Sequence, residues 1–284
     1  MRLTTEEFWK SRPETHISSL GKNASTGRGL LRRTIDRVRL RHGAEPGQSY
    51  NDFAIQQLLT SYLPVRPDWR AIEIGCAPGD NLARLHRMFG YIPYGIEYTH
   101  SGVLSTLDTF RRRGLDTANI TEADFFDGDF HERFRGNFDV VFSDGFVEHF
   151  DPPCEVLRLH VNLLKTGGYL ICIIPNLLGV FYPFLRLCAL DLLERHNCKL
   201  MGEDTFRRMF EPFELDVKFC GYVGAPQFYG SSLKGEASLR GVAAAALDRA
   251  QDILDLCMFM SNWRGSPGNR MGASLVFVGQ RIHA

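Results

Sequence analysis

Two short motifs contain the residues of this sequence that could do chemistry: a glycine-rich turn and a loop that carries a histidine. The turn reads Glu73-Ile74-Gly75-Cys76-Ala77-Pro78-Gly79-Asp80-Asn81. Glycines between a strand and a helix allow the backbone to approach a ligand closely, and the amides at the start of the helix then point towards it. The loop reads Asp144-Gly145-Phe146-Val147-Glu148-His149-Phe150. Its histidine titrates near neutral pH and is therefore suited to accept a proton from a bound molecule.

Short apolar runs alternate with helical stretches around both motifs. Strands are expected at residues 71–75, 94–97, 120–124, 139–143 and 169–174, with helices at 81–89, 102–113 and 154–164. This alternation is typical of βαβ units, whose right-handed crossovers give a doubly wound sheet with helices on both faces. Two more strands, at 215–221 and 273–279, flank a long helix at 237–260 and leave an antiparallel edge open. The predicted fold class is therefore α/β, with a mostly parallel, seven-stranded, Rossmann-like sheet.

An acidic residue closes the second expected strand. Glu97 stands eighteen residues after Gly79, where a carboxylate is placed to accept hydrogen bonds from ribose hydroxyls. The dinucleotide fingerprint G-x-G-x-x-G nevertheless fails, because its second and third glycines fall on Ala77 and Asp80 when the first is aligned on Gly75.

The turn instead resembles the first motif of class I S-adenosylmethionine (SAM)-dependent methyltransferases, commonly E/D-x-G-x-G-x-G, with Ala77 in place of the middle glycine. Four further pieces follow in the order of that family: YGIEY, EADFFD, FDVVFSDGFVEHFDPP and LLKTGGYLICIIPN. The resemblance covers about residues 70 to 176. It implies SAM as cofactor, S-adenosylhomocysteine as product, and these cofactor-binding residues: Glu73, Gly75, Cys76, Ala77, Gly79, Asn81, Glu97, Tyr98, Asp124, Phe125, Ser143 and Gly145.

The resemblance also implies a role for several of these residues. The turn would hold the methionyl end of SAM, with Glu73 near its ammonium group or ordering the loop. Glu97 would bind the ribose and Asp124 the adenine amino group. Tyr98 and Phe125 would be apolar walls, unless they are ordinary core residues.

The histidine loop is similar to the E-H-x-x-D-P stretch of ubiquinone-biosynthesis-like O-methyltransferases, through Glu148, His149, Asp151 and Pro152. SAM carries an activated methyl group, so the protein mainly has to align an acceptor, and a hydroxyl acceptor gains further from a base. We expect His149 and Asp144 to be the catalytic residues. A purely structural histidine that caps the loop is the alternative.

The acceptor side is expected to come from the N-terminal extension and from insertions at 176–214 and 230–265. Substrate contacts are expected from these residues: His100, Phe146, His196 and Asn197. The apolar composition of 176–214 suits a small molecule with an apolar part, a lipid-linked substrate or burial in a homodimer. This stretch also resembles bacterial methyltransferases encoded among glycan or natural-product genes, which favours a small-molecule or glycan acceptor. Asp144 and His149 could share a divalent ion, but no compact ligand cluster is visible, so no metal is expected.

Nucleic acid is an unlikely partner, because Lys and Arg number 33 and Asp and Glu also number 33. The stretch Asp151-Pro152-Pro153-Cys154 is similar to the D-P-P-Y signature of nucleic-acid amino-methyltransferases, but it comes seven residues late and lacks the aromatic residue. It fits a helix start better, with Asp151 as the N-cap. The arginine-rich segment 28–41 predicts an amphipathic helix with a solvated arginine face, while an anion or partner site stays open.

The length of 284 residues favours two domains, or one domain with an extension. We assign 1–65 to a helical N-terminal extension and 66–284 to the methyltransferase domain. Seven scattered cysteines without a C-x-x-C pair, and the absence of a secretory leader, indicate the cytoplasm. The apolar run 169–193 contains Arg186 and Asp191, so a buried strand ending at Pro175 and an apolar helix are expected rather than a transmembrane span, although peripheral membrane contact stays open.

The sequence therefore predicts a SAM-dependent methyltransferase that acts on a hydroxyl oxygen of a small molecule or glycan. A small-molecule N-methyltransferase, a non-catalytic SAM-binding partner protein and a nucleotide-dependent dehydrogenase are the alternatives.

Overall fold

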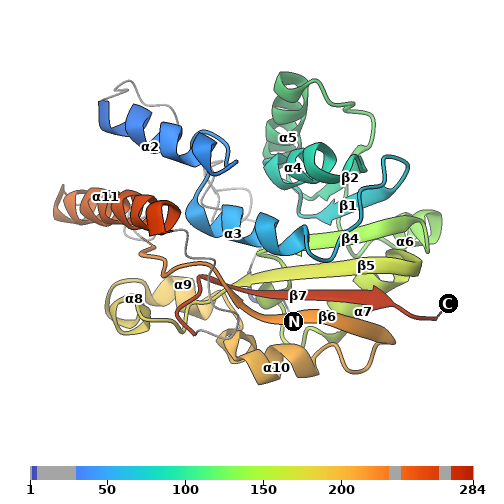
Figure 1. Cartoon of the computed structure of the whole chain (residues 1–284). Helices are drawn as coiled ribbons and strands as arrows, with labels where there is room; N and C mark the ends of the chain where they lie inside the picture. Colours follow the sequence, from blue (N-terminus) through green and yellow to red (C-terminus); the bar gives the residue numbers. More distant parts are fainter. Residues whose placement is uncertain (1, 5–29, 230–237, 262–269, 284) are drawn as a thin grey trace.

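The computed structural model of the chain describes residues 2–4, 30–229, 238–261 and 270–283 (Figure 1). Its centre is one seven-stranded sheet in the order β3-β2-β1-β4-β5-β7-β6. The strands are β1 (Arg70–Ile74), β2 (Ile92–Glu97), β3 (Ile120–Glu122), β4 (Phe138–Asp144), β5 (Leu164–Pro175), β6 (Leu215–Val223) and β7 (Ser274–Arg281). The first five pair in parallel, whereas β7 is antiparallel to both β5 and β6. The predicted fold class is confirmed, including the antiparallel edge.

The helices that connect these strands follow the predicted order. They are α4 (Asp80–Phe89), α5 (His100–Arg113), α6 (Gly128–Phe134), α7 (Cys154–Leu163), α8 (Tyr182–Cys188), α9 (Leu190–Glu194), α10 (Glu203–Arg208) and α11 (Ser238–Ser261), preceded by α2 (Leu30–Arg41) and α3 (Tyr50–Leu59). Short 3-10 turns lie at Val147–His149 and Cys198–Met201. The prediction that Asp151 caps α7 is wrong, because the N-cap position is Pro153 and the chain enters the helix without a side-chain cap.

Helices cover both faces of the sheet. Because consecutive strand residues point to opposite sides, neighbouring residues of one strand belong to different cores. In β4, Val141 packs into a core with Leu157 of α7, whereas its neighbour Val140 packs into a second core with Ile55 of α3 and Leu85 of α4. The helix α3 therefore covers the sheet itself, although the sequence assigned it to an extension.

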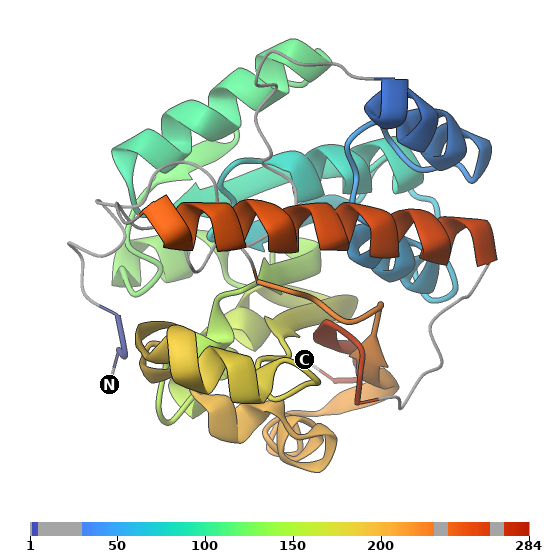
Figure 2. The same ribbon diagram turned by 90° about the vertical axis from the view of Figure 1, so that its left-hand side faces the viewer.

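The helix α11 packs against both α2 and α3 at one end of the molecule. Figure 2 shows α11 running across this end of the molecule. Phe259 of α11 contacts Tyr50 of α3, with ring centroids 5.3 Å apart. The arginine face of α2 is only partly solvated, since Arg37 and Arg41 are exposed while Arg39 is buried and pairs with Asp36 at 3.0 Å. Residues 28–29 of the predicted arginine helix, and parts of the 230–265 insertion, lie outside the described residues.

The apolar run 169–193 forms the predicted buried strand. It contributes most of β5, which ends at Pro175, and then the short helices α8 and α9. Within the described ranges, no helix is long and apolar enough to cross a membrane.

Candidate functional site

A cavity of about 190 Å³ opens at the carboxyl ends of the parallel strands, where this class of sheet binds its ligands. Both sequence motifs contribute to its wall. The predicted site residues that line it are Glu73, Gly75, Ala77, Asn81, Glu97, Tyr98, Asp124, Phe125, Asp144, Gly145, Phe146 and His149. The predicted site residues outside this lining are Cys76, Gly79, Ser143, His100, His196 and Asn197.

The glycine-rich turn owes its shape to two left-handed glycines. Gly75 has φ +73°, and a Cβ there would lie 3.3 Å from the ring of Phe146, so the narrow space beside it depends on the missing side chain. Gly79 has φ +91° and starts α4, and its Cβ would lie 2.9 Å from Cγ2 of Thr106. Gly79 therefore packs α4 against α5, and the buried Cys76 contacts the same threonine.

Two carboxyl groups, joined by Asn81, lie at the turn end of the cavity. Nδ2 of Asn81 donates to Oε1 of Glu73 at 2.9 Å and to Oδ2 of Asp144 at 3.4 Å. Burial raises the pKa of Glu73 well above its usual range and that of Asp144 to about 7, and the charge of Asp52 adds to the second effect. Oε2 of Glu73 is buried and has no hydrogen-bond partner within the described residues. This end of the cavity can therefore receive a cationic group.

Glu97 lines the cavity and is held in place by Thr99 at the start of α5. Its Oε1 accepts hydrogen bonds from the amide of Thr99 at 2.9 Å and from Oγ1 of Thr99 at 2.8 Å. Because both bonds use Oε1, Oε2 keeps its capacity to bind a hydroxyl. A Cβ at Gly102 would lie 2.8 Å from Cδ of Glu97, so the carboxylate occupies this place only beside a glycine.

Asp124 already has a cationic partner from the first residues of the chain. Nη2 of Arg2 lies 2.7 Å from both Oδ1 and Oδ2 of Asp124, and the guanidinium sits 4.7 Å from the ring centroid of Phe126. The neighbouring Phe125 is buried and packs edge-on against Phe146, with centroids 5.5 Å apart. The Asp124 end of the cavity thus combines a carboxylate with aromatic walls.

The histidine loop is fixed by a segment that lies far from it in the sequence. Nδ1 of His149 lies 2.8 Å from the carbonyl oxygen of Arg195, and the amide of Asn197 donates to the carbonyl of Glu148 at 2.7 Å. From the other side, the amide of Leu3 donates to the carbonyl of His149 at 2.8 Å. Every residue of 176–214 is described and none lines the cavity, so this segment acts there by supporting the loop.

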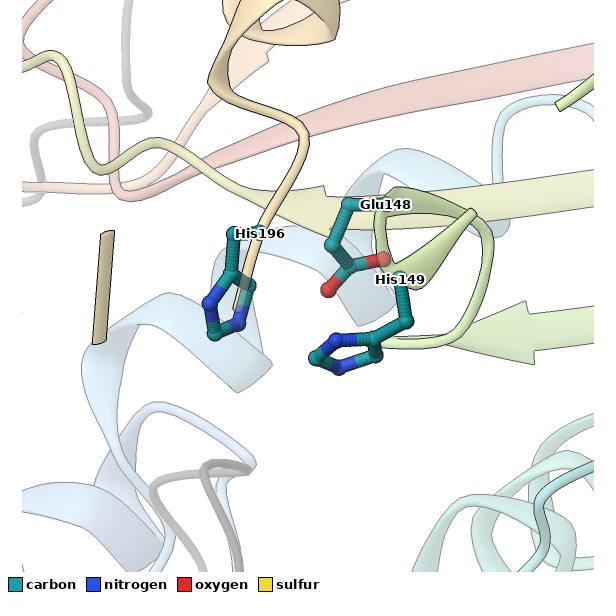
Figure 3. A group of neighbouring side chains, drawn as sticks. All are labelled: Glu148, His149 and His196. Atoms are coloured by element: carbon teal, nitrogen blue, oxygen red, sulfur yellow. The ribbon is translucent and has the colours of Figure 1, made fainter. Parts of the chain in front are cut away.

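The same support brings three potential metal ligands together. One ligand atom each from Glu148, His149 and His196 lies within 4.8 Å of the others, and Figure 3 shows the carboxylate directed towards the space between the two rings. Glu148 and His149 line the cavity. This group could not be foreseen from the sequence, because His149 and His196 lie 47 positions apart and meet only through tertiary packing.

The remaining predicted residues lie elsewhere. His100 is exposed and its Nδ1 lies 2.8 Å from Oε2 of Glu122, on the outside of the sheet edge. Ser143 is buried in β4 and donates to Sγ of Cys172 at 3.7 Å. The sequence missed several lining residues from α3 and from the segment after β6, namely Asn51, Asp52, Ile55, Gln227 and Tyr229. Their local sequence contains no signal for a site.

Comparison with known proteins agrees with this geometry. A family model described as a methyltransferase domain matches residues 66–205, the segment that contains the turn and the histidine loop. Residues 66–205 therefore match a methyltransferase domain, and the sheet that contains them has the Rossmann-like fold of class I, SAM-dependent methyltransferases. A search of curated proteins gives no match.

Solved structures share the fold at low sequence identity. Geranyl diphosphate C-methyltransferase from Streptomyces coelicolor A3(2), in complex with Mg²⁺, geranyl diphosphate and S-adenosylhomocysteine, is 14% identical, with 97% of this chain and 96% of that chain covered and a TM-score of 0.58. A possible histamine N-methyltransferase from Thermotoga maritima is 16% identical over 88% of this chain and 95% of that chain, with a TM-score of 0.52. The (4+2)-cyclase SpnF is 13% identical over 81% of both chains, with a TM-score of 0.53. The fold therefore leaves the acceptor atom open.

SAM is the cofactor of this class of domain, and the cavity fits it on two observations. The buried, unpartnered Oε2 of Glu73 matches a need for a cationic group, and SAM carries an ammonium and a sulfonium. The space beside Gly75, which a Cβ would fill, matches a ligand that approaches the backbone closely.

Proposed function

We propose that the chain transfers the methyl group of SAM to a hydroxyl oxygen of a small molecule or glycan, with His149 as general base in the metal-free protein. The observation that carries this proposal is the position of the imidazole in the wall of the cofactor cavity. A carbonyl oxygen only accepts, so the contact with Arg195 assigns the proton to Nδ1. Nε2 of His149 then has a lone pair that can accept the hydroxyl proton.

The cofactor would lie along the cavity with its methionyl end at the glycine-rich turn. In this orientation Glu73 and Asp144 receive the ammonium group, Glu97 binds the ribose hydroxyls, and Asp124 binds the adenine amino group after it parts from Arg2. These assignments are supported by the order in which the residues line the cavity from the turn to the edge of the sheet.

The reaction needs one bond to form, one to break and one proton to move. The acceptor oxygen attacks the methyl carbon, the carbon–sulfur bond breaks, and its electron pair stays on sulfur to give S-adenosylhomocysteine. The proton of the acceptor hydroxyl passes to Nε2 of His149 and then to water. A positioned base is typically worth about 10²- to 10⁴-fold in rate.

The acceptor wall supports a polar, uncharged substrate group. Nδ2 of Asn51 donates to Oε1 of Gln227 at 2.9 Å, so two amide side chains meet beside the apolar Ile55. Such a wall can bind hydroxyls by hydrogen bonds while it packs against a ring or carbon chain. Asp52 on the same wall favours a second candidate, a small amine that is methylated on nitrogen.

Two steps test the proposal on the full chain. Calorimetric titration should give tight binding of S-adenosylhomocysteine and none of NADH, since a dehydrogenase would show the opposite. Methyl-labelled SAM is then incubated with panels of sugars, phenols and small amines. We expect label in a hydroxyl compound and a loss of about 10²-fold or more in His149→Gln, with His100→Gln as the control outside the cavity. Label only in amines, or an unchanged rate in His149→Gln, would refute the assignment.

A further inference from the structure

We propose that Glu148, His149 and His196 bind a divalent transition-metal ion, and that the ion presents an open coordination position to the cavity. Two imidazoles and one carboxylate form a ligand set that zinc and non-haem iron sites use. The three ligand atoms lie within 4.8 Å of one another, and the side chains point towards a common space (Figure 3). Three protein ligands leave the remaining position to water or substrate, which is the pattern of catalytic rather than structural sites.

Hydrogen bonds orient both imidazoles for this role. Nδ1 of His149 lies 2.8 Å from the carbonyl of Arg195, and Nδ1 of His196 lies 2.6 Å from the carbonyl of Leu192. Each carbonyl accepts the Nδ1 proton, so Nε2 of each neutral ring carries the lone pair that a metal needs. Metal-bound histidines commonly donate their second nitrogen to a carbonyl or carboxylate in this way.

Burial and charge also favour a cation. The exposed fractions are 0% for Glu148, 2% for His149 and 5% for His196. With neutral rings the group carries one negative charge, and a buried carboxylate is costly unless a cation or several donors stabilise it. Because Glu148 and His149 also line the cavity, an ion can reach the group from solvent through the cofactor site.

The geometry requires a modest contraction. Metal–ligand distances of about 2.0 to 2.2 Å in a tetrahedral site place ligand atoms about 3.4 Å apart. The widest separation in the group is up to 4.8 Å, so side chains must move inwards by about 1 Å when the ion binds. The imidazoles select zinc, iron or cobalt over Mg²⁺, which prefers oxygen ligands and retains its water.

The inference deepens the proposed function, and its consequence for catalysis rests on methyl transfer to a hydroxyl. In the loaded protein the lone pair of His149 belongs to the metal, so the imidazole is no longer the base. A hydroxyl bound at the open position would instead lose its proton more readily because the ion stabilises the alkoxide. Binding of the ion itself does not depend on the acceptor or on catalysis.

The test is a titration of the chelator-treated full chain with Co²⁺, followed by displacement with Zn²⁺. We expect one ion per chain, visible absorption bands of tetrahedral or five-coordinate Co²⁺, and no comparable binding of Mg²⁺. His196→Gln should weaken Co²⁺ binding by about 100-fold or more, since even residues that only orient ligands are worth about 10- to 100-fold. His196 does not line the cavity, so the variant should still bind S-adenosylhomocysteine, which confirms that it is folded.

His160→Gln is the matched control. His160 is equally buried and its Nδ1 lies 2.7 Å from the carbonyl of Val156, but it lies outside the three-residue group. Its replacement should leave the affinity for Co²⁺ unchanged. Binding of less than one ion per chain, or equal losses in His196→Gln and His160→Gln, would overturn the metal site. Those outcomes would leave S-adenosylhomocysteine binding and methyl transfer intact, so a failure of this inference is distinct from a failure of the proposed function.

Discussion

Binding of S-adenosylhomocysteine should release a proton near neutral pH, and Asp144 should be its source. Burial, with the charge of Asp52, raises the pKa of Asp144 to about 7. An ammonium group placed between Asp144 and Glu73 favours the ionised carboxylate, so binding lowers this pKa. The bound form therefore has fewer protons than the free form, and affinity must increase as the pH rises.

The size of the effect follows from the pKa. A group with a pKa of about 7 is about half protonated at pH 7 and about nine-tenths protonated at pH 6. If Asp144 is fully ionised in the complex, binding of one ligand therefore releases about 0.5 proton at pH 7 and about 0.9 proton at pH 6. If only the ionised form binds, the affinity at pH 6 is about tenfold lower than at pH 8, or about 1.4 kcal/mol.

Calorimetry measures this directly when one titration is repeated in buffers with different ionisation enthalpies. Asp144→Asn should remove the part of the proton release that is centred near pH 7, while Glu73, whose pKa is also raised, keeps its own contribution. Asp52→Asn should retain the release but move its midpoint to lower pH, because the Asp52 charge contributes to the raised pKa. No proton release by the wild type between pH 6 and 8, or the same release in Asp144→Asn, would refute this reasoning.

Four other outcomes are expected. Asp144→Asn should stabilise the ligand-free protein against thermal unfolding at pH 8 but not at pH 4. The reason is that the pKa of Asp144 is higher in the folded than in the unfolded chain, so the stability of the wild type falls as the pH rises from about 4 to 7. Glu97→Gln should weaken S-adenosylhomocysteine binding by about 1–3 kcal/mol in calorimetry, since a ribose hydroxyl loses a charged acceptor; unchanged affinity would remove Glu97 from the site. Arg2→Ala should strengthen the same binding by about 1.5- to 5-fold, because a half-exposed ion pair that competes for Asp124 is worth about 0.2–1 kcal/mol; weaker binding would make Arg2 part of the ligand site. Phe277→Ala should cost about 3–5 kcal/mol of unfolding free energy in urea, because the ring is fully buried against Phe210; a cost below about 1 kcal/mol would contradict that packing.

The sequence predicted what local pattern and chain order determine. The glycine-rich turn, Glu97 at the end of β2 and the loop after β4 follow strands that the sequence predicted, and parallel strands bring their carboxyl ends to the same side of the sheet. A local rule failed at the start of α7. The Asp151-Pro152 sequence resembles a helix cap, yet α7 begins at Cys154 behind Pro153.

The acceptor side of the site was the least predictable part. The lining residues Asn51 and Ile55 belong to α3, and the packing of this helix on the sheet becomes visible only in the structure. The proximity of His196 to His149 depends on the path of the chain after β5, which no periodicity encodes. The candidate metal group and the partner of Asp124 were therefore invisible before the fold was known.

The anchoring of the histidine loop limits how this protein could acquire a new substrate. Leu3 bonds the backbone of His149, Arg195 bonds its ring, and Asn197 bonds the carbonyls of Glu148 and Phe150. Two segments far apart in the sequence, one at residue 3 and one at 195–197, thus set the position of one side chain. A chimera that exchanges residues 176–214 for those of another methyltransferase would misplace the imidazole as well as alter the surroundings of the acceptor. Specificity in this chain should therefore diverge by point substitutions in α3 and after β6, and only rarely by the exchange of whole insertions.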